Sequence, residues 1–204
     1  MSIALVAIIL AIGAGAVVAV STREPAAGAI GLAVALVASA LLADPLPSAA
    51  ILGVRIVAGL LAAALVRSAV GSSESQPSPL GWPAEAMLAT AGAVAGLGVG
   101  LGLEALAGAT GLGGPGTGPE ALTVMALATA AGTSLLVLGA APSIHGRPGI
   151  RRAIGLVLLT QAVLLIRVGI AGPGIDLEEI ARAALLVAAA ATGTALARAG
   201  AATE

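Results

Sequence analysis

Long apolar runs, separated by short polar or turn-forming segments, organise the whole chain. Taking about 20 apolar residues for each crossing of a bilayer, we divide it into seven segments. Proline, glycine or charged residues bound each segment. The predicted spans are residues 3–20, 26–42, 48–66, 84–106, 121–141, 150–171 and 177–199. The pattern therefore predicts an all-α integral membrane protein, with residues 1–204 as a single transmembrane helical domain of about seven helices.

The first and last segments each allow a second interpretation. The first resembles a signal peptide in its hydrophobicity, but it has no basic n-region, so we expect a retained helix. The last is the least hydrophobic at its start, where it could begin as an interfacial helix.

Composition agrees with a membrane protein and excludes several functions. Hydrophobic residues make up 59% of the chain and charged residues 9%, and the mean hydropathy is +1.11. A net charge of -1 without any lysine offers no basic surface for nucleic acid. The chain has no cysteine and a single histidine, which cannot build a metal site alone. We therefore expect no metal and no cofactor.

The arginines are distributed unevenly between the two sides of this seven-span topology. One side receives Arg23, Arg67, Arg147, Arg151, Arg152 and Arg198. The positive-inside rule then places the C-terminus in the cytoplasm and the N-terminus outside, for a multi-pass protein of the plasma or inner membrane. Arg167 and Arg182 lie near the opposite face, close to an acidic cluster. That cluster, Asp176, Glu178 and Glu179, is expected to complement the dipole at the start of a helix.

Arg55 is the most informative polar residue, because it lies within the third apolar span. A charge inside the membrane costs roughly 3 kcal/mol on insertion scales, and at 1.5 Å per residue this one lies roughly 10 Å below the outer boundary. It could tune a proton or ion path. It could equally be a structural pin between two helices, or a side chain that snorkels to the interface. The sequence leaves these interpretations open.

Three other polar residues are candidates for an ion path. Gln161 lies at the centre of the sixth span, preceded by Thr160. An amide at that depth commonly joins helices by hydrogen bonding, and it could otherwise only organise water. Glu104 and Glu120 flank a glycine-rich outer loop, where we expect them to be solvated unless Glu104 turns inward.

Small residues predict where helices approach closely. Gly92, Gly96 and Gly100 recur every four residues in the fourth span, and such a stripe lets another helix backbone come near. The fifth span has a similar small face, formed by Ala126, Thr129, Ala130 and Thr133. The glycine stripe is not a dinucleotide-binding motif, because it follows no strand, and residues 111–118 do not form a phosphate-binding loop, because no Lys-Ser or Lys-Thr pair follows them.

No nucleophile and base are arranged for catalysis, so we do not expect the isolated chain to be an enzyme. The remaining interpretation is a helical membrane subunit whose partner subunits supply the chemistry.

Residues 151–163, Arg-Arg-Ala-Ile-Gly-Leu-Val-Leu-Leu-Thr-Gln-Ala-Val, resemble the K-type membrane subunit of respiratory complex I and the C-type subunit of Mrp antiporters. Those proteins have three helices. The chain looks most like their longer, roughly seven-helix relative, component E of hydrogenase-4 and other membrane-bound hydrogenases of the formate hydrogenlyase type. Residues 44–67, 121–152 and 176–198 also fit this likeness.

The resemblance implies a non-catalytic membrane subunit of a complex I-like, energy-converting hydrogenase. Its partners would be antiporter-like subunits and the subunit that anchors the redox arm, and it would assist coupled proton or sodium translocation. The family has a glutamate in the helix after the basic start, where this chain has Thr160 and Gln161. We therefore expect Arg55 to lack an acidic partner within this chain. Its counter-charge, and the helices covering the glycine stripe, would belong to other subunits.

Two alternatives remain. The chain could be a small secondary transporter or exporter in which Arg55 binds an anionic solute; inverted repeats would favour this, and no convincing repeat between the halves is visible. It could also be a scaffold subunit of another membrane complex.

Overall fold

The computed structural model describes residues 3–22, 24–42, 47–69, 82–109, 124–145, 149–172 and 174–201, and within them it is all-helical apart from short turns and connections. The helices are α1 (Ile3–Ser21), α2 (Pro25–Ala40), α3 (Ala49–Ser68), α4 (Trp82–Ala109), α5 (Val124–His145), α6 (Gly149–Ala171) and α7 (Asp176–Ala201). Six are long and apolar enough to cross a membrane, and α2 is a shorter apolar helix of 16 residues. The predicted all-α membrane fold is confirmed, and each predicted span matches one helix.

Local chemistry explains where several helices begin and end. Pro25 occupies the first turn of α2, where its missing N–H costs nothing. The Ser48 Oγ accepts a hydrogen bond of 3.4 Å from the backbone N–H of Ile51 and so caps α3. The predicted fifth span ends at Ala141, but α5 continues through Pro142 to His145. The proline has no N–H to donate to the Leu138 carbonyl four residues earlier, and the helix ends three residues after it.

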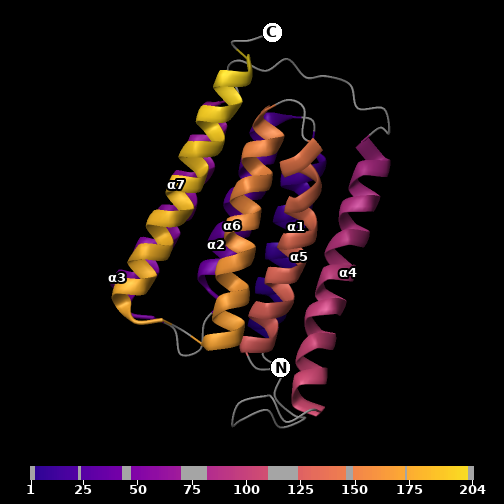
Figure 1. Ribbon diagram of the computed structural model, residues 1–204, viewed down its shortest axis with the longest axis vertical. Coiled ribbons are helices and arrows are strands. Elements are labelled where there is room, and N and C mark those ends of the chain that lie inside the picture. The colour runs from indigo at the N-terminus through magenta and orange to yellow at the C-terminus, as the bar shows by residue number, and fades with distance from the viewer. Residues whose placement is uncertain are drawn as a thin grey trace.

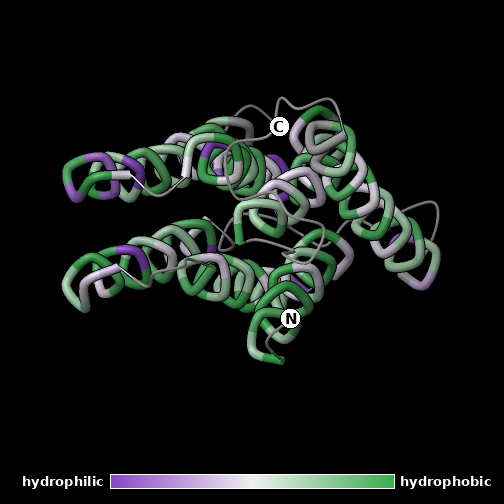
Figure 2. The backbone as a smooth tube through the Cα atoms, turned by 90° about the horizontal axis from the view of Figure 1, so that it is seen from below, coloured by the Kyte–Doolittle hydropathy of each residue, from purple (hydrophilic) through white to green (hydrophobic). Residues whose placement is uncertain are grey.

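The helices form two layers. In the first, α2 packs between α1 and α3, and in the second α6 packs between α5 and α7. The layers face each other in the same order, with α1 against α5 and α3 against α7 (Figures 1 and 2). Helix α4 packs against α5 and α1 at one edge. The start of α1 and the end of α7 lie at opposite ends of the bundle.

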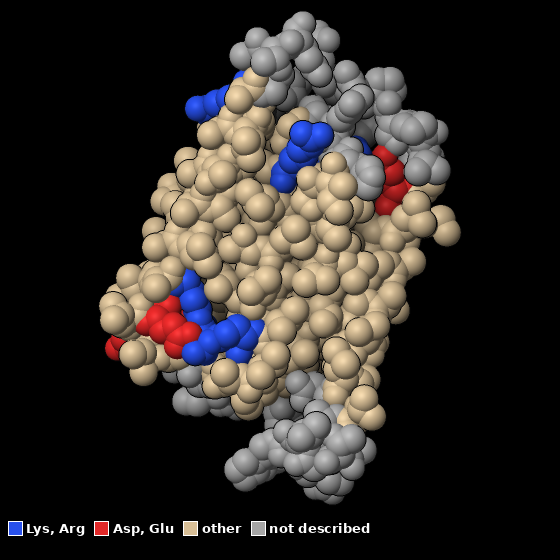
Figure 3. All heavy atoms as spheres, in the orientation of Figure 1, with Lys and Arg blue, Asp and Glu red and all other residues tan. Residues whose placement is uncertain are grey.

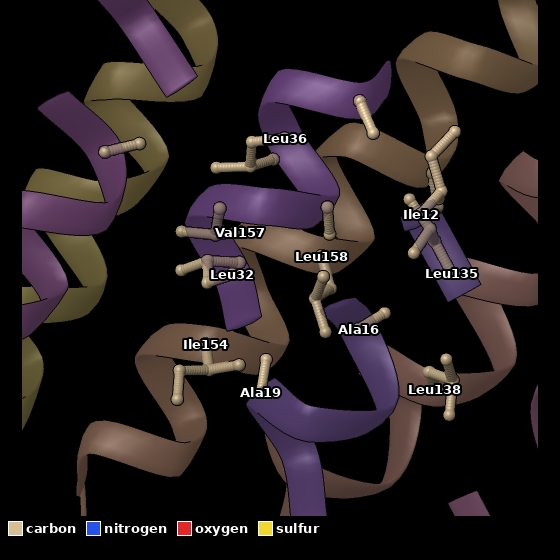
Figure 4. Packing of buried hydrophobic residues seen from close by; sticks show 14 of the residues in the cluster. Ile12, Ala16, Ala19, Leu32, Leu36, Leu135, Leu138, Ile154, Val157 and Leu158 are labelled. Atoms are coloured by element: carbon tan, nitrogen blue, oxygen red, sulfur yellow. The ribbon is translucent and has the colours of Figure 1, made fainter. Parts of the chain in front are cut away.

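The space between the layers is closely filled by aliphatic side chains. Figure 4 shows α1, α2, α5 and α6 meeting there through residues such as Ile12, Leu32, Leu135 and Leu158, each at most 1% exposed. The outward faces are apolar too, for example Val57 at 62% exposure and Val163 at 59%. Large apolar side chains so widely exposed would be a liability in water, but they suit a lipid environment. The protein is thus a multi-pass membrane protein.

The two layers repeat the same helix crossing. A Cβ placed on Gly31 would meet Gly15 O at 2.7 Å and Ala19 N at 2.8 Å, where α2 crosses α1. A Cβ placed on Gly155 would meet Gly139 O at 2.9 Å and Ser143 N at 2.5 Å, where α6 crosses α5. Only glycine allows backbones to approach this closely.

The residues of the second crossing, Gly139, Ser143 and Gly155, each lie 124 residues after those of the first, Gly15, Ala19 and Gly31. Arg55 and Glu179 are separated by the same 124 residues. Residues 29–32 and residues 153–156 are both Ala-Ile-Gly-Leu. The helix order, the crossing and this tetrapeptide identify α1–α3 and α5–α7 as a parallel repeat joined through α4. The expectation that the halves share no convincing repeat was wrong, because few identities survive between two sequences of alanine, valine and leucine.

The glycine stripe of α4 allows the close approach that its spacing predicts. A Cβ on Gly96 would lie 2.5 Å from the Ser134 Cα in α5, and the Thr133 Oγ1 donates a hydrogen bond of 2.6 Å to the Gly96 carbonyl. The neighbours of Gly92 and Gly100 are also in α5, including Ala130 of the predicted small face. The expectation that another subunit covers the stripe was wrong, since α5 of the same chain does so.

Candidate functional site

Arg55 forms an ion pair with Glu179 across the two layers. The Arg55 Nη2 lies 2.6 Å from the Glu179 Oε2, and the Arg55 Nε donates to the same oxygen at 2.9 Å. The Arg55 Nη1 also donates to the carbonyl of Ala40 at the end of α2, at 3.4 Å. The expectation that Arg55 has no acidic partner in this chain was therefore wrong. Its counter-charge comes from the first turn of α7.

Glu179 accepts hydrogen bonds on both carboxylate oxygens. Besides the contacts of its Oε2 with Arg55, its Oε1 accepts one hydrogen bond from the Arg182 Nη1 at 2.7 Å and one from the Gly174 N–H at 3.2 Å. The residue is only 4% exposed. A buried carboxylate needs such compensation, because desolvation of an unpaired charge costs several kcal/mol. These contacts with Arg55, Arg182 and Gly174 compensate the buried charge.

The network extends along the same end of the bundle through Glu178. This carboxylate pairs with the Arg182 Nη2 at 2.7 Å and with Arg167 at the end of α6. The Arg167 Nη1 also donates to the Gly172 carbonyl at 2.9 Å. Dipole complementation was therefore an incomplete account of the acidic cluster. Glu178 and Glu179 join α3, α6 and α7, while Asp176 is exposed.

Gln161 joins the two layers deeper in the bundle. Its Nε2 donates a hydrogen bond of 2.8 Å to the Ser39 Oγ on α2, and the residue is buried. This confirms the interhelical hydrogen bonding that its position in the sixth span predicts. Thr160, in contrast, donates to the carbonyl of Leu156 in its own helix. The side chain of Glu104 and all of Glu120 lie outside the described residues.

A cavity of about 60 Å³ lies between the ion pair and Gln161. Its polar wall is formed by Ser39, Arg55, Gln161, Glu179 and Arg182. Leucine, alanine and valine side chains of α2, α3, α6 and α7 complete it. The cavity thus lies at the interface between the two repeats.

The opposite end of the bundle carries the other described arginines. The Arg151 Nη2 lies 3.1 Å from the Glu85 Oε2, and the Arg198 Nη2 donates to the Ser68 carbonyl at 3.1 Å. Figure 3 shows separated basic groups near this end, and acidic and basic groups gathered together at the start of α7. The structure groups the described arginines into two ends as the sequence predicts. Arg23 and Arg147 lie outside the described residues.

Sequence reasoning identified Arg55 and Gln161 as candidates but missed Ser39, Glu179 and Arg182. The missing signal was the register of the repeat, which places Glu179 at the position in α7 that Arg55 has in α3. The assembled site can hold paired charges and can offer polar groups to a molecule in the cavity between the two helix layers. Comparisons of the chain with protein-family models, curated proteins and solved structures found no match.

Proposed function

We propose that the protein is a non-catalytic membrane subunit of a complex I-like, membrane-bound hydrogenase, where it assists coupled proton or sodium translocation. The observation that carries this proposal is the Arg55–Glu179–Arg182 network between two membrane-embedded helix layers. Ionisable groups within the membrane are costly, and they commonly mark ion and proton paths.

The repeat adds support to the family resemblance. The resembling segment belongs to three-helix membrane proteins, and here two three-helix layers carry Ala-Ile-Gly-Leu in their middle helices, at residues 29–32 and 153–156. A chain built from two such units fits an assembly in which three-helix subunits pack side by side.

Affinity purification from native membranes in a mild detergent tests the proposal. Antiporter-like subunits and hydrogenase subunits should copurify, and their yield should fall for Arg55→Ala with the chain still inserted. Recovery of the chain as a stable homo-oligomer that binds a solute, without such partners, would reject the assignment.

A small secondary transporter is the second candidate, and the cavity favours it. Transporters place their substrate sites near mid-membrane at the interface between repeats, and parallel repeats are one of their known arrangements. The Arg55 guanidinium on the cavity wall would then bind an anionic solute. Uptake of anions into liposomes containing only this chain would support this candidate, and uptake unchanged by Arg55→Gln would count against it.

A further inference from the structure

The cavity is polar enough and large enough to hold water. A buried site takes up water when it has at least about 10–15 Å³ of space for a water-sized probe and two to four polar partners. The cavity has about 60 Å³, with five polar or charged side chains on its wall. A cavity of this kind is hydrated, whereas a purely apolar one of similar size stays dry.

The cavity extends towards the end of the bundle where the ion-pair network lies, since Arg55, Glu179 and Arg182 line it. The Arg55 side chain is 15% exposed and that of Arg182 is 10% exposed, so neither is fully enclosed. This is the end at which α2 and α6 finish and α3 and α7 begin. We therefore place the opening of the cavity at that end.

The inner limit of the cavity is at the Gln161–Ser39 hydrogen bond. Gln161 lies roughly 15 Å along α6 from its end at Ala171, at 1.5 Å per residue, which is about half of a 30 Å hydrocarbon core. In the next turns of α2 and α6, towards the opposite end, Leu32, Ala35, Val157 and Leu158 are all fully buried. These side chains close the path.

We infer that the space between the two repeats is an aqueous vestibule, open at the Glu179 end and closed at mid-membrane below Gln161. Water is its ligand. The inference deepens the proposed function and rests on it only for its purpose, because hydration can be measured on the purified chain. Such a vestibule would form half of a water-filled path across the bilayer. The other half of the path would have to open by movement of the helices or to come from another subunit.

The chain contains no cysteine, so single cysteines report on hydration without a background. The probe is Ag⁺, which is small enough for the cavity and reacts with thiolate, the form that a wet environment permits and an apolar one suppresses. Purified Leu165→Cys and Ser39→Cys variants would be reconstituted into sealed liposomes and exposed to Ag⁺ on each side in turn. Thiols left unreacted would then be counted with a fluorescent maleimide after denaturation.

Leu165→Cys and Ser39→Cys should react from one side only, the side on which an Asp176→Cys marker reacts. Val163→Cys is the matched control, since it lies in the same helix at similar depth but is 59% exposed outside the cavity, towards lipid. Val163→Cys should react with Ag⁺ at least about ten-fold more slowly. An apolar environment raises the pKa of a thiol, and each unit of this rise lowers the fraction of reactive thiolate about ten-fold. Val157→Cys, below the closure, should stay unreacted.

Equal rates at positions 163 and 165, or reaction at position 165 from the Arg198 side, would overturn the vestibule. If a cysteine variant fails to fold, hydroxyl-radical footprinting of the unaltered chain decides instead. Oxidation of Leu36 and Leu165 with protection of Leu158 is the expected result, and protection of all three would reject the proposal. Loss of partner subunits in the purification above would leave either result unaffected, so the two proposals fail independently.

Discussion

The Glu179→Gln substitution tests most directly what holds the two layers together. The amide keeps nearly the same shape, but it leaves the Arg55 guanidinium without its carboxylate, while Arg182 keeps its ion pair with Glu178. Removing one partner of a buried ion pair costs about 3–5 kcal/mol, since the remaining charge is uncompensated. Arg55 is still 15% exposed and can reach water, so we expect the lower end, about 3 kcal/mol. The free energy of unfolding would be measured by titrating mixed micelles with a denaturing detergent and following helical circular dichroism.

Glu178→Gln is the matched control, one residue away in the same helix and the same network. The Glu178 side chain is 32% exposed. Exposed ion pairs contribute about 0–1 kcal/mol, so this variant should unfold at nearly the unaltered denaturant concentration. If both variants lose the same stability, or neither loses more than about 1 kcal/mol, the Glu179 contacts do not stabilise the layer interface.

Charge reversal distinguishes a shared carboxylate from a simple pair. In an isolated pair, the double variant Arg55→Glu/Glu179→Arg would recover most of the lost stability. Here Arg182 depends on the same carboxylate at 2.7 Å, so the reversal would place two guanidiniums together. We expect the double variant to be no more stable than Glu179→Gln, and full recovery would refute the shared arrangement.

Three further predictions follow from particular contacts. Gly96→Ala should cost about 1–3 kcal/mol by overpacking α4 against α5, whereas Gly98→Ala, with nothing within 4 Å, should be neutral or up to about 1 kcal/mol stabilising; equal unfolding of the two variants would contradict the close crossing. A double-mutant cycle of Gln161→Ala and Ser39→Ala should give a coupling free energy of about 0.6 kcal/mol, the average for membrane hydrogen bonds, and zero coupling would show that the bond contributes nothing. Arg55→Lys should retain part of the coupled activity or assembly that Arg55→Ala loses, because an ammonium can still pair with Glu179 but cannot also keep the bond to the Ala40 carbonyl. Full activity of the alanine variant would show that Arg55 has no role in coupling.

The parallel repeat gives the ion pair a physical context. Arg55 and Glu179 occupy equivalent positions in α3 and α7, so one layer supplies a cation where the other supplies an anion. Two identical layers would have placed like charges together, which is unfavourable in a medium of low dielectric constant. The opposite charges at this position therefore favour pairing of the first layer with the second over pairing of either layer with itself.

The sequence by itself determined the helices and their approximate ends. Hydrophobicity over about 20 residues, Pro25 in a first turn and Ser48 at a cap are local signals, and each acts within one helix. Glycine spacing likewise showed which face of α4 allows a close approach, because the 3.6-residue period is a property of the helix alone. The division of the arginines between two ends also follows from counting spans.

Only the tertiary structure decided which helices are neighbours. Within a bilayer all outward faces are apolar, so hydrophobicity cannot say which helix the Gly96 face meets or which carboxylate Arg55 reaches. Arg55 and Glu179 are 124 residues apart, and Ser39 and Gln161 are 122 apart. Their pairing depends on the stacking of two layers in register. The cavity has the same origin, since it is bounded by four helices that only this stacking brings together.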